Sequence, residues 1–226
     1  MTVVEQPTEA WPALPLEEWR ETQATLHLWT QVVGKVKLAL TPFLNEWWNV
    51  AFAVTPRGLT TGPIPAGDGA FAVDFDFVDH ALFVRVSDGS STVLALIPRS
   101  VADFYAEFRA TLRALGIKVA INPLPVEVPD PIPFDVDREH ASYDQEPVQR
   151  WWRMVIQTEQ ALQRFRSPFV GKSSPVHFFW GSFDLAVTRF SGRIAPPHPG
   201  GIPHLPDEVT REAYSHEVIS AGFWAG

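Results

Sequence analysis

The stretch of sequence that decides the fold is FAVDFDF, residues 71–77. Its large apolar residues occupy the odd positions, and alanine or aspartate occupies the even positions. Successive side chains of a strand point to opposite faces, so this alternation predicts a β-strand with one buried face. The strand anchors an antiparallel meander in the N-terminal half of the chain.

A return strand is expected directly after this stretch. A two-residue turn after Val78 would place Phe75 opposite Val84 and Asp74 opposite Arg85. Both the apolar face and the charged face match in this register, and Asp74 with Arg85 makes an opposite-charge pair across the strands. A second turn at Asp-Gly, residues 88–89, predicts a third strand at 92–97.

Three segments have the spacing of helices. In residues 16–40 apolar side chains recur every three or four positions, which places them on one helical face, and Pro42 ends the helix. Ser100 is the expected N-cap of a second helix that ends at Gly116. A third helix is predicted at 146–166.

Short apolar stretches predict further strands at 47–54, 117–121, 176–180 and 185–190, and the tail at 208–224 fits either a helix or a strand. The predicted fold class is α+β: an antiparallel β-meander, two to three covering helices, and a C-terminal strand and helix segment that closes a cleft.

The domain organisation follows from proline content and periodicity. Residues 1–15 are predicted to be a flexible N-terminal tail, and residues 16–226 a single α+β domain. Five prolines in residues 123–133 favour an extended chain. This crossover would join two sub-lobes, 16–122 and 134–226.

Composition narrows the class of protein. A hydrophobic content of 46%, with nine Trp and sixteen Phe, supplies a substantial core. The net charge of −8 without a basic run argues against binding to nucleic acid or to an anionic membrane surface. The absence of cysteine excludes disulfides and thiolate chemistry and fits a reducing compartment. Without an apolar signal core or a stretch near the ~20 residues of a membrane helix, a cytoplasmic location is predicted.

Three long segments carry a family resemblance: WPALPLEEWRETQATLHLWTQVVGKVKLALTP (11–42), SPVHFFWGSFDLAVTRFSGR (174–193) and EAYSHEVISAGFWAG (212–226). They resemble an uncharacterised bacterial protein family, a domain of unknown function, over nearly the whole chain. The resemblance implies no activity and no site residues.

Standard catalytic motifs are absent. His216-Glu217 begins the zinc-protease pattern His-Glu-x-x-His, but Ser220 stands where the second His would be. The segment 181–184, Gly-Ser-Phe-Asp, lacks the second glycine of a nucleophile elbow, so a serine triad with His177 is not the leading hypothesis.

The candidate site rests on residues 172–193, where ionisable groups stand among large apolar residues. Small-molecule sites combine apolar walls with a few polar groups, so we predict a pocket between the first helix and the C-terminal third. The alternative is a core strand whose polar side chains satisfy backbone groups or each other. The predicted catalytic residues are His177, Asp184, His216 and Glu217, and the predicted ligand-binding residues are His27, Trp180, Ser182 and Arg189.

The first helix offers a second polar surface. His27 lies on a stripe with Arg20, Gln23 and Gln31, which faces either water or a cleft. Gly34 would permit close approach of another element.

The histidines leave a metal site open as a further hypothesis. His177, His216 and Glu217 would hold a divalent metal if they met in space, and otherwise each is a hydrogen-bonded or surface residue. The protein is therefore predicted to be a small-molecule enzyme or ligand-binding protein. The alternative is a non-catalytic interaction protein or homodimer that uses the exposed aromatic residues 223–224.

Overall fold

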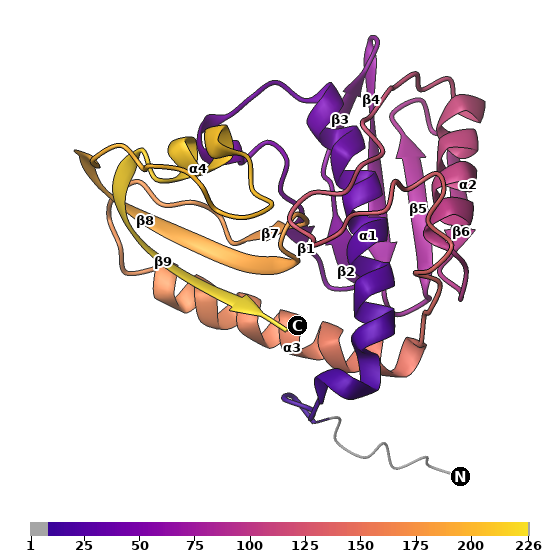
Figure 1. Ribbon diagram of the computed structural model, residues 1–226, viewed down its shortest axis with the longest axis horizontal. Helices are drawn as coiled ribbons and strands as arrows, with labels where there is room; N and C mark the ends of the chain where they lie inside the picture. The colour runs from indigo at the N-terminus through magenta and orange to yellow at the C-terminus, as the bar shows by residue number, and fades with distance from the viewer. Residues whose placement is uncertain (1–8, 226) are drawn as a thin grey trace.

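The computed structural model describes residues 9–225, so the first eight residues of the predicted N-terminal tail lie outside the described part of the chain. These residues form an α+β fold with four α-helices and two antiparallel sheets, of six and three strands. The two sheets lie on either side of one long helix, α1 (Leu16–Leu40), as Figure 1 shows.

Helix α1 is the structural centre of the molecule. Every residue from Thr25 to Lys37 is buried, although the sequence shows only one apolar face. Trp29 and Val33 point into the main core, as their spacing predicts. The remaining faces are covered by the small sheet and by the chain at 123–133, which explains how polar residues of α1 become buried.

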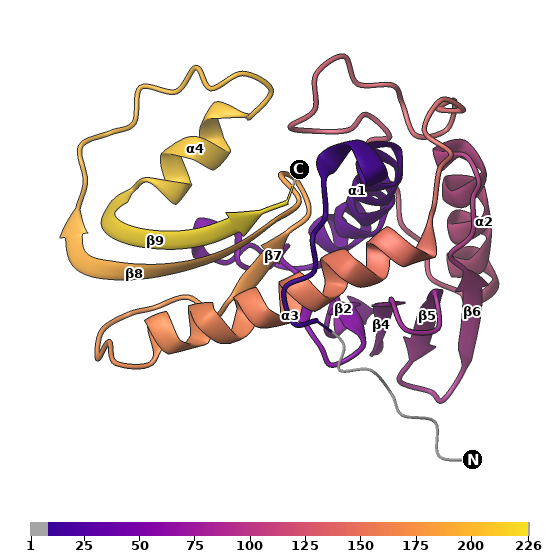
Figure 2. The same cartoon turned by 90° about the horizontal axis from the view of Figure 1, so that it is seen from below.

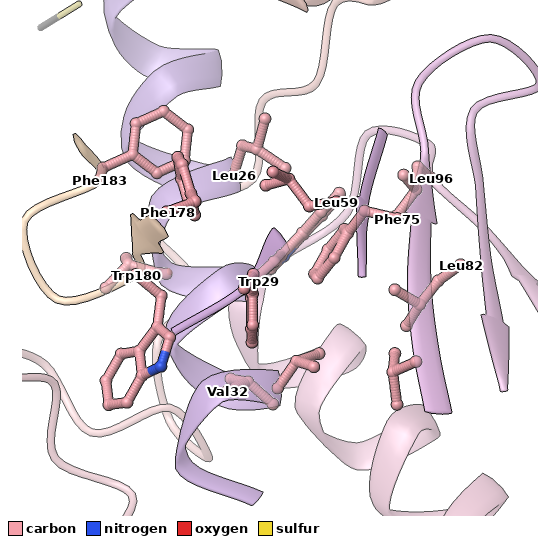
Figure 3. Close-up of a cluster of buried hydrophobic side chains, with 14 of the residues drawn as sticks. Leu26, Trp29, Val32, Leu59, Phe75, Leu82, Leu96, Phe178, Trp180 and Phe183 are labelled. Carbon is pink, nitrogen blue, oxygen red and sulfur yellow. The ribbon is translucent and has the colours of Figure 1, made fainter. Parts of the chain in front are cut away.

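The larger sheet has the strand order β1-β2-β4-β5-β6, with β3 paired to β4. Its strands are β1 (Ala53–Val54), β2 (Gly58–Thr60), β3 (Ile64–Ala66), β4 (Gly69–Asp76), β5 (Ala81–Val86) and β6 (Ser91–Ala95). The predicted alternation of the central strand is confirmed, since Phe71, Val73 and Phe75 are each at most 1% exposed. Their face packs on α1 (Figure 3).

The predicted register of the β4–β5 hairpin is wrong by two residues. Phe75 pairs with Leu82 rather than Val84. The cause is the carboxylate of Asp76, which accepts hydrogen bonds from two backbone N–H groups of the turn and so stabilises a four-residue connection. A slip of two keeps every side chain on its expected face, and the ion pair between Arg85 and its acidic neighbour on β4 is still formed.

Helices α2 (Val101–Ala114) and α3 (Gln145–Arg166) match the predicted helices. Ser100 caps α2 by accepting the N–H of Asp103 at 3.1 Å, and a similar cap begins α3. The strand predicted at 117–121 is wrong. The N–H of Ile117 is already bonded to the carbonyl of Leu112, and no strand of the described chain pairs with this segment.

The smaller sheet has the order β7-β8-β9, with β7 (His177–Phe179), β8 (Asp184–Ile194) and β9 (His216–Trp224). Of the strand predicted at 47–54, only the last two residues form a strand, β1, which follows the short 3₁₀ helix η1 (Asn45–Trp47). The C-terminal tail at 208–224, for which the sequence allowed either a helix or a strand, contains both, since helix α4 (Asp207–Ala213) precedes strand β9.

One continuous core links the two sheets. Trp151 of α3 stacks on Phe183 with ring centroids 4.9 Å apart and contacts Trp19 of α1 at 6.0 Å. Figure 2 shows α3 running beneath both sheets. Trp180 lies directly on Gly34, where a Cβ atom would come within 2.3 Å of its indole ring. The predicted close approach at Gly34 is therefore confirmed.

Candidate functional site

A cavity of about 610 Å³ lies against the N-terminal half of α1. Its other walls are the proline-rich segment 125–132, the turn before β8 at Ser182, and the end of β9 at Trp224. Most of the lining is apolar, with a few ionisable side chains, as small-molecule sites usually are. The volume falls within the range of such sites.

The polar stripe of α1 runs along this cavity, although Arg20 at its N-terminal end is also exposed to water. Arg20, Gln23 and His27 all line it. Gln31, the fourth residue of the stripe, binds the backbone of Val126 instead. Its Oε1 accepts the Val126 N–H at 2.9 Å, and its Nε2 donates to the Val126 carbonyl at 2.8 Å. This double hydrogen bond fastens the proline-rich wall to the helix.

The β7–β8 turn brings the C-terminal part of the chain to the same place. Residues 180–183 form a four-residue turn closed by a hydrogen bond from the Phe183 N–H to the Phe179 carbonyl. The turn separates the two strands, so Trp180, Ser182 and Asp184 do not share one face of a continuous strand.

The tautomer of His27 follows from its partner. Its Nε2 lies 2.8 Å from the carbonyl oxygen of Gly181, which can only accept, so Nε2 carries the proton. Burial lowers the pKa of His27, and the neutral ring is the form present near pH 7. Nδ1 then holds the free lone pair, on a side chain that lines the cavity.

Glu127 is the central acidic group of the site. The Ser182 hydroxyl donates a hydrogen bond to its Oε2. A Cβ atom at Gly181 would lie 2.1 Å from Glu127 Oε1, so only glycine admits the carboxylate this close to the turn. Burial raises the pKa of Glu127, and the hydrogen bond from Ser182 opposes that rise.

Asp184 supplies a second carboxylate beside the first. Burial, and next the charge of nearby Glu127, raise the pKa of Asp184 to about 7. A carboxyl group that titrates near neutral pH can both give and accept a proton there. Perturbed groups of this kind occur preferentially at functional sites.

Backbone strain is concentrated around the same side chains. Glu127, Asp130 and Phe183 all have positive φ, at 58°, 46° and 61°. Residues other than glycine pay about 1 to 3 kcal/mol for such conformations, which cluster at functional sites. Here the strain sets the positions of the proline-rich wall and of the turn that carries Ser182.

Two of the eight predicted site residues, His27 and Ser182, line this cavity, and Asp184 lies near Glu127 at the start of β8 without lining it. His177 lies elsewhere, packed edge-on against Trp48 at 5.8 Å. Burial, and then the positive charges of Lys37 and Arg166, lower the pKa of His177 to about 4, so its ring is neutral.

The predicted residues His216 and Glu217 lie far from His177 along the length of β8. His177 pairs with Ala186 and His216 with Ile194, eight residues apart, or roughly 25 Å of strand. Glu217 forms an exposed ion pair with Arg193 at 2.6 Å.

Two further predicted residues have packing roles outside the cavity. The Trp180 indole donates to the Val50 carbonyl at 2.9 Å, inside the core. The Arg189 guanidinium lies 3.7 Å from the centre of the Phe165 ring.

The structure does not bring the three predicted metal ligands, His177, His216 and Glu217, together. Among residues 9–225, no group of three or more His, Asp or Glu side chains is arranged to hold a metal ion.

Sequence reasoning missed Glu127, Asp130 and Trp224 as lining residues. Glu127 and Asp130 stand in the proline-rich segment, which was interpreted only as a crossover. The one available signal was that acidic residues interrupt this proline run.

The fold and the cavity together define an α+β protein with two antiparallel sheets around a central helix, which forms one wall of a mostly apolar pocket. The chain belongs to the family of unknown function DUF5996, whose model matches residues 11–226. This confirms the family resemblance over nearly the whole chain, while its bacterial origin stays a prediction. No curated protein and no solved structure matches the chain.

Within the described part of the chain, no helix has both the length and the apolar character needed to cross a membrane.

Proposed function

We propose that this protein is an enzyme that binds a small organic molecule in the α1 cavity and moves a proton on it. The observation that carries the proposal is the meeting of Glu127, Ser182 and His27 at one cavity, with the carboxyl group of Asp184 close enough to feel the charge of Glu127. Three elements far apart in the sequence contribute these groups. The backbone is strained where two of them are attached, at Glu127 and beside Ser182.

The chemistry follows from the protonation states. Near pH 7 Asp184 exists in both forms, so it serves as an acid in one and a base in the other. The neutral His27 ring offers a second acceptor at Nδ1. Ser182 holds Glu127 in place through its hydroxyl, and the apolar wall limits access of water to the reacting group.

A cavity-filling variant tests whether the cavity is the binding site. Ala24 lines the cavity, and Ala24→Trp would occupy much of its volume. Ala110→Trp is the matched control, because Ala110 is exposed on α2 and lies outside the cavity. A library of small metabolite-like compounds is screened by ligand-observed NMR against all three proteins.

Compounds are expected to bind the wild type and the Ala110→Trp control, and to lose binding in Ala24→Trp. Proton transfer is then followed as deuterium uptake into the bound compounds in heavy water, which Asp184→Asn should slow. Compounds that bind Ala24→Trp as well as they bind the wild type would refute the location of the site.

A second candidate function has its own observation. Strand β9 is the edge of the smaller sheet and exposes Ile219 (67%) and Trp224 (65%). Exposed edge strands pair readily with another chain, which supports a homodimer through β9. Sedimentation at rising concentration tests this. A wild-type dimer that Ile219→Lys converts to a monomer supports it, and a monomer at all concentrations excludes it.

A further inference from the structure

His140 is a second histidine of the α1 cavity, besides His27. Its side chain lines the cavity and is 36% exposed, so the ring is not part of the hydrophobic core. The chain reaches His140 directly after the proline-rich wall, through a turn at 134–136. Its ring therefore stands where a bound molecule could touch it.

The ring of His140 is held by a buried carboxylate. Its Nδ1 lies 2.8 Å from Oδ2 of Asp137, whose side chain is fully buried. The other carboxylate oxygen, Oδ1, accepts the backbone N–H groups of Glu139 at 3.0 Å and of His140 at 3.1 Å. These two bonds already close the local turn. The bond from Oδ2 to the ring is therefore additional to what the turn needs.

The backbone fixes both residues against the start of α2. The carbonyl of Asp137 accepts the N–H of Ala102 at 2.9 Å, and the carbonyl of His140 accepts the N–H of Val101 at 3.0 Å. The N–H of Asp137 donates to the carbonyl of Pro133 at 3.0 Å. The pair is thus attached to a helix, and support of this kind keeps a side chain in one orientation.

The hydrogen bond to Asp137 also selects the tautomer of the ring. A carboxylate oxygen only accepts, so Nδ1 carries the proton and the lone pair of the neutral ring is on Nε2. Within residues 9–225, Nε2 of His140 forms no hydrogen bond, and no other histidine ring is bonded to a carboxylate. His140 therefore combines an oriented ring, a free lone pair and a place at the cavity.

We propose that His140 is the general base of the α1 cavity and that Asp137 is its positioning residue. Nε2 takes a hydrogen from the bound molecule as a proton, the electron pair of the broken bond stays on the molecule, and a new N–H bond forms. The carboxylate of Asp137 stabilises the resulting imidazolium through the bond to Nδ1. This inference rests on the proposed function, because it names the group that accepts the proton. Asp184 does not line the cavity, so His140 is the group that takes the first proton.

The ring opening of 5-nitrobenzisoxazole is the test, because a base in an apolar cavity accelerates it. The base removes the C–H proton of the five-membered ring, the electron pair of that bond completes a nitrile, and the N–O bond breaks to leave a coloured phenolate. The full-length protein is assayed by absorbance at pH 8, where an ordinary imidazole is neutral. The wild type should open the ring at least about tenfold faster than His140→Gln.

His216→Gln is the matched control, because His216 lies on β9 outside the cavity, and it should keep the wild-type rate. Ala24→Trp, which fills the cavity, should remove the acceleration. A wild-type rate that His140→Gln leaves unchanged would overturn the inference, and so would a wild type no faster than free imidazole. The library screen decides the proposed function separately in both cases.

Asp137 acts through the ring, so its test reads the ring itself. Long-range proton–nitrogen NMR spectra report which nitrogen of His140 carries the proton, and the wild type at pH 8 should show it on Nδ1. In Asp137→Asn the amide can donate to Nδ1, so the proton should move to Nε2 and ring opening should slow at least about tenfold. An unchanged tautomer and rate in folded Asp137→Asn would overturn the positioning role. A wild-type proton on Nε2 would overturn the inference without any substitution, even if the variant fails to fold.

Discussion

Replacing Asp184 with asparagine should make the stability of the protein less sensitive to pH. In the folded protein burial and Glu127 raise the pKa of Asp184 from its ordinary value of 3.8 to about 7. Between these two values the folded state keeps a proton that the unfolded state has lost. Raising the pH therefore lowers the free energy of unfolding, and this loss of stability is complete above about pH 7.

The size of the effect follows from the two pKa values. A rise from 3.8 to about 7 corresponds to an upper limit of about 4 kcal/mol. The side chain keeps some contact with solvent, and water screening lowers this figure. We expect the unfolding free energy of Asp184→Asn, relative to that of the wild type, to rise by about 2 kcal/mol from pH 4 to pH 8.

The assay is urea unfolding of both proteins at several pH values, read as the difference in unfolding free energy. The difference isolates Asp184 from His177, whose lowered pKa acts in the opposite direction. That histidine stabilises the fold above pH 6.5, and its contribution is lost as the pH falls towards 4. The exposed Asp68→Asn serves as control and should give a flat difference. A difference for Asp184→Asn that is also independent of pH from 4 to 8 would refute the conclusion that burial and Glu127 raise the pKa of Asp184.

Two further substitutions probe the packing and the local structure. Gly34→Ala should destabilise the protein by about 1 to 3 kcal/mol in urea unfolding despite the better helix propensity of alanine, because its Cβ would lie 2.3 Å from Trp180. An unchanged or higher stability would show that the indole can move. Ser100→Ala should cost about 1 kcal/mol in thermal unfolding by removing the hydrogen bond to the Asp103 N–H, and no loss would mean that water replaces the cap.

The elements that could be predicted from sequence are those with local signals. The Ser100 cap needs only the three residues that follow it, and the central strand needs only its own alternation. The hairpin register depends on which N–H groups the Asp76 carboxylate accepts. That choice is not visible in the hydrophobic pattern, because a shift of two residues preserves both faces.

The candidate site was predictable only in part because its groups meet through tertiary structure. His27 and Ser182 drew attention as polar residues in apolar surroundings. Glu127 is 55 residues from its partner Ser182, in a segment without periodicity, so no spacing rule connects them. His177 and His216 have similar sequence surroundings, but the length of β8 separates them.

Because Thr25–Lys37 of α1 is buried on every side, different parts of the protein should open locally at different free-energy costs. Amide protons in the buried stretch from Thr25 to Lys37 should exchange with solvent only when the whole protein unfolds, because no face of this stretch is free. The proline-rich segment is held by fewer contacts: the two hydrogen bonds of Gln31, the Ser182–Glu127 hydrogen bond and the Glu127 N–H bonded to the His204 carbonyl. We expect it to open at a lower free-energy cost than the core. If the proposed ligand binds in this cavity, we expect it to enter and leave by local opening of this wall while the core behind it stays folded.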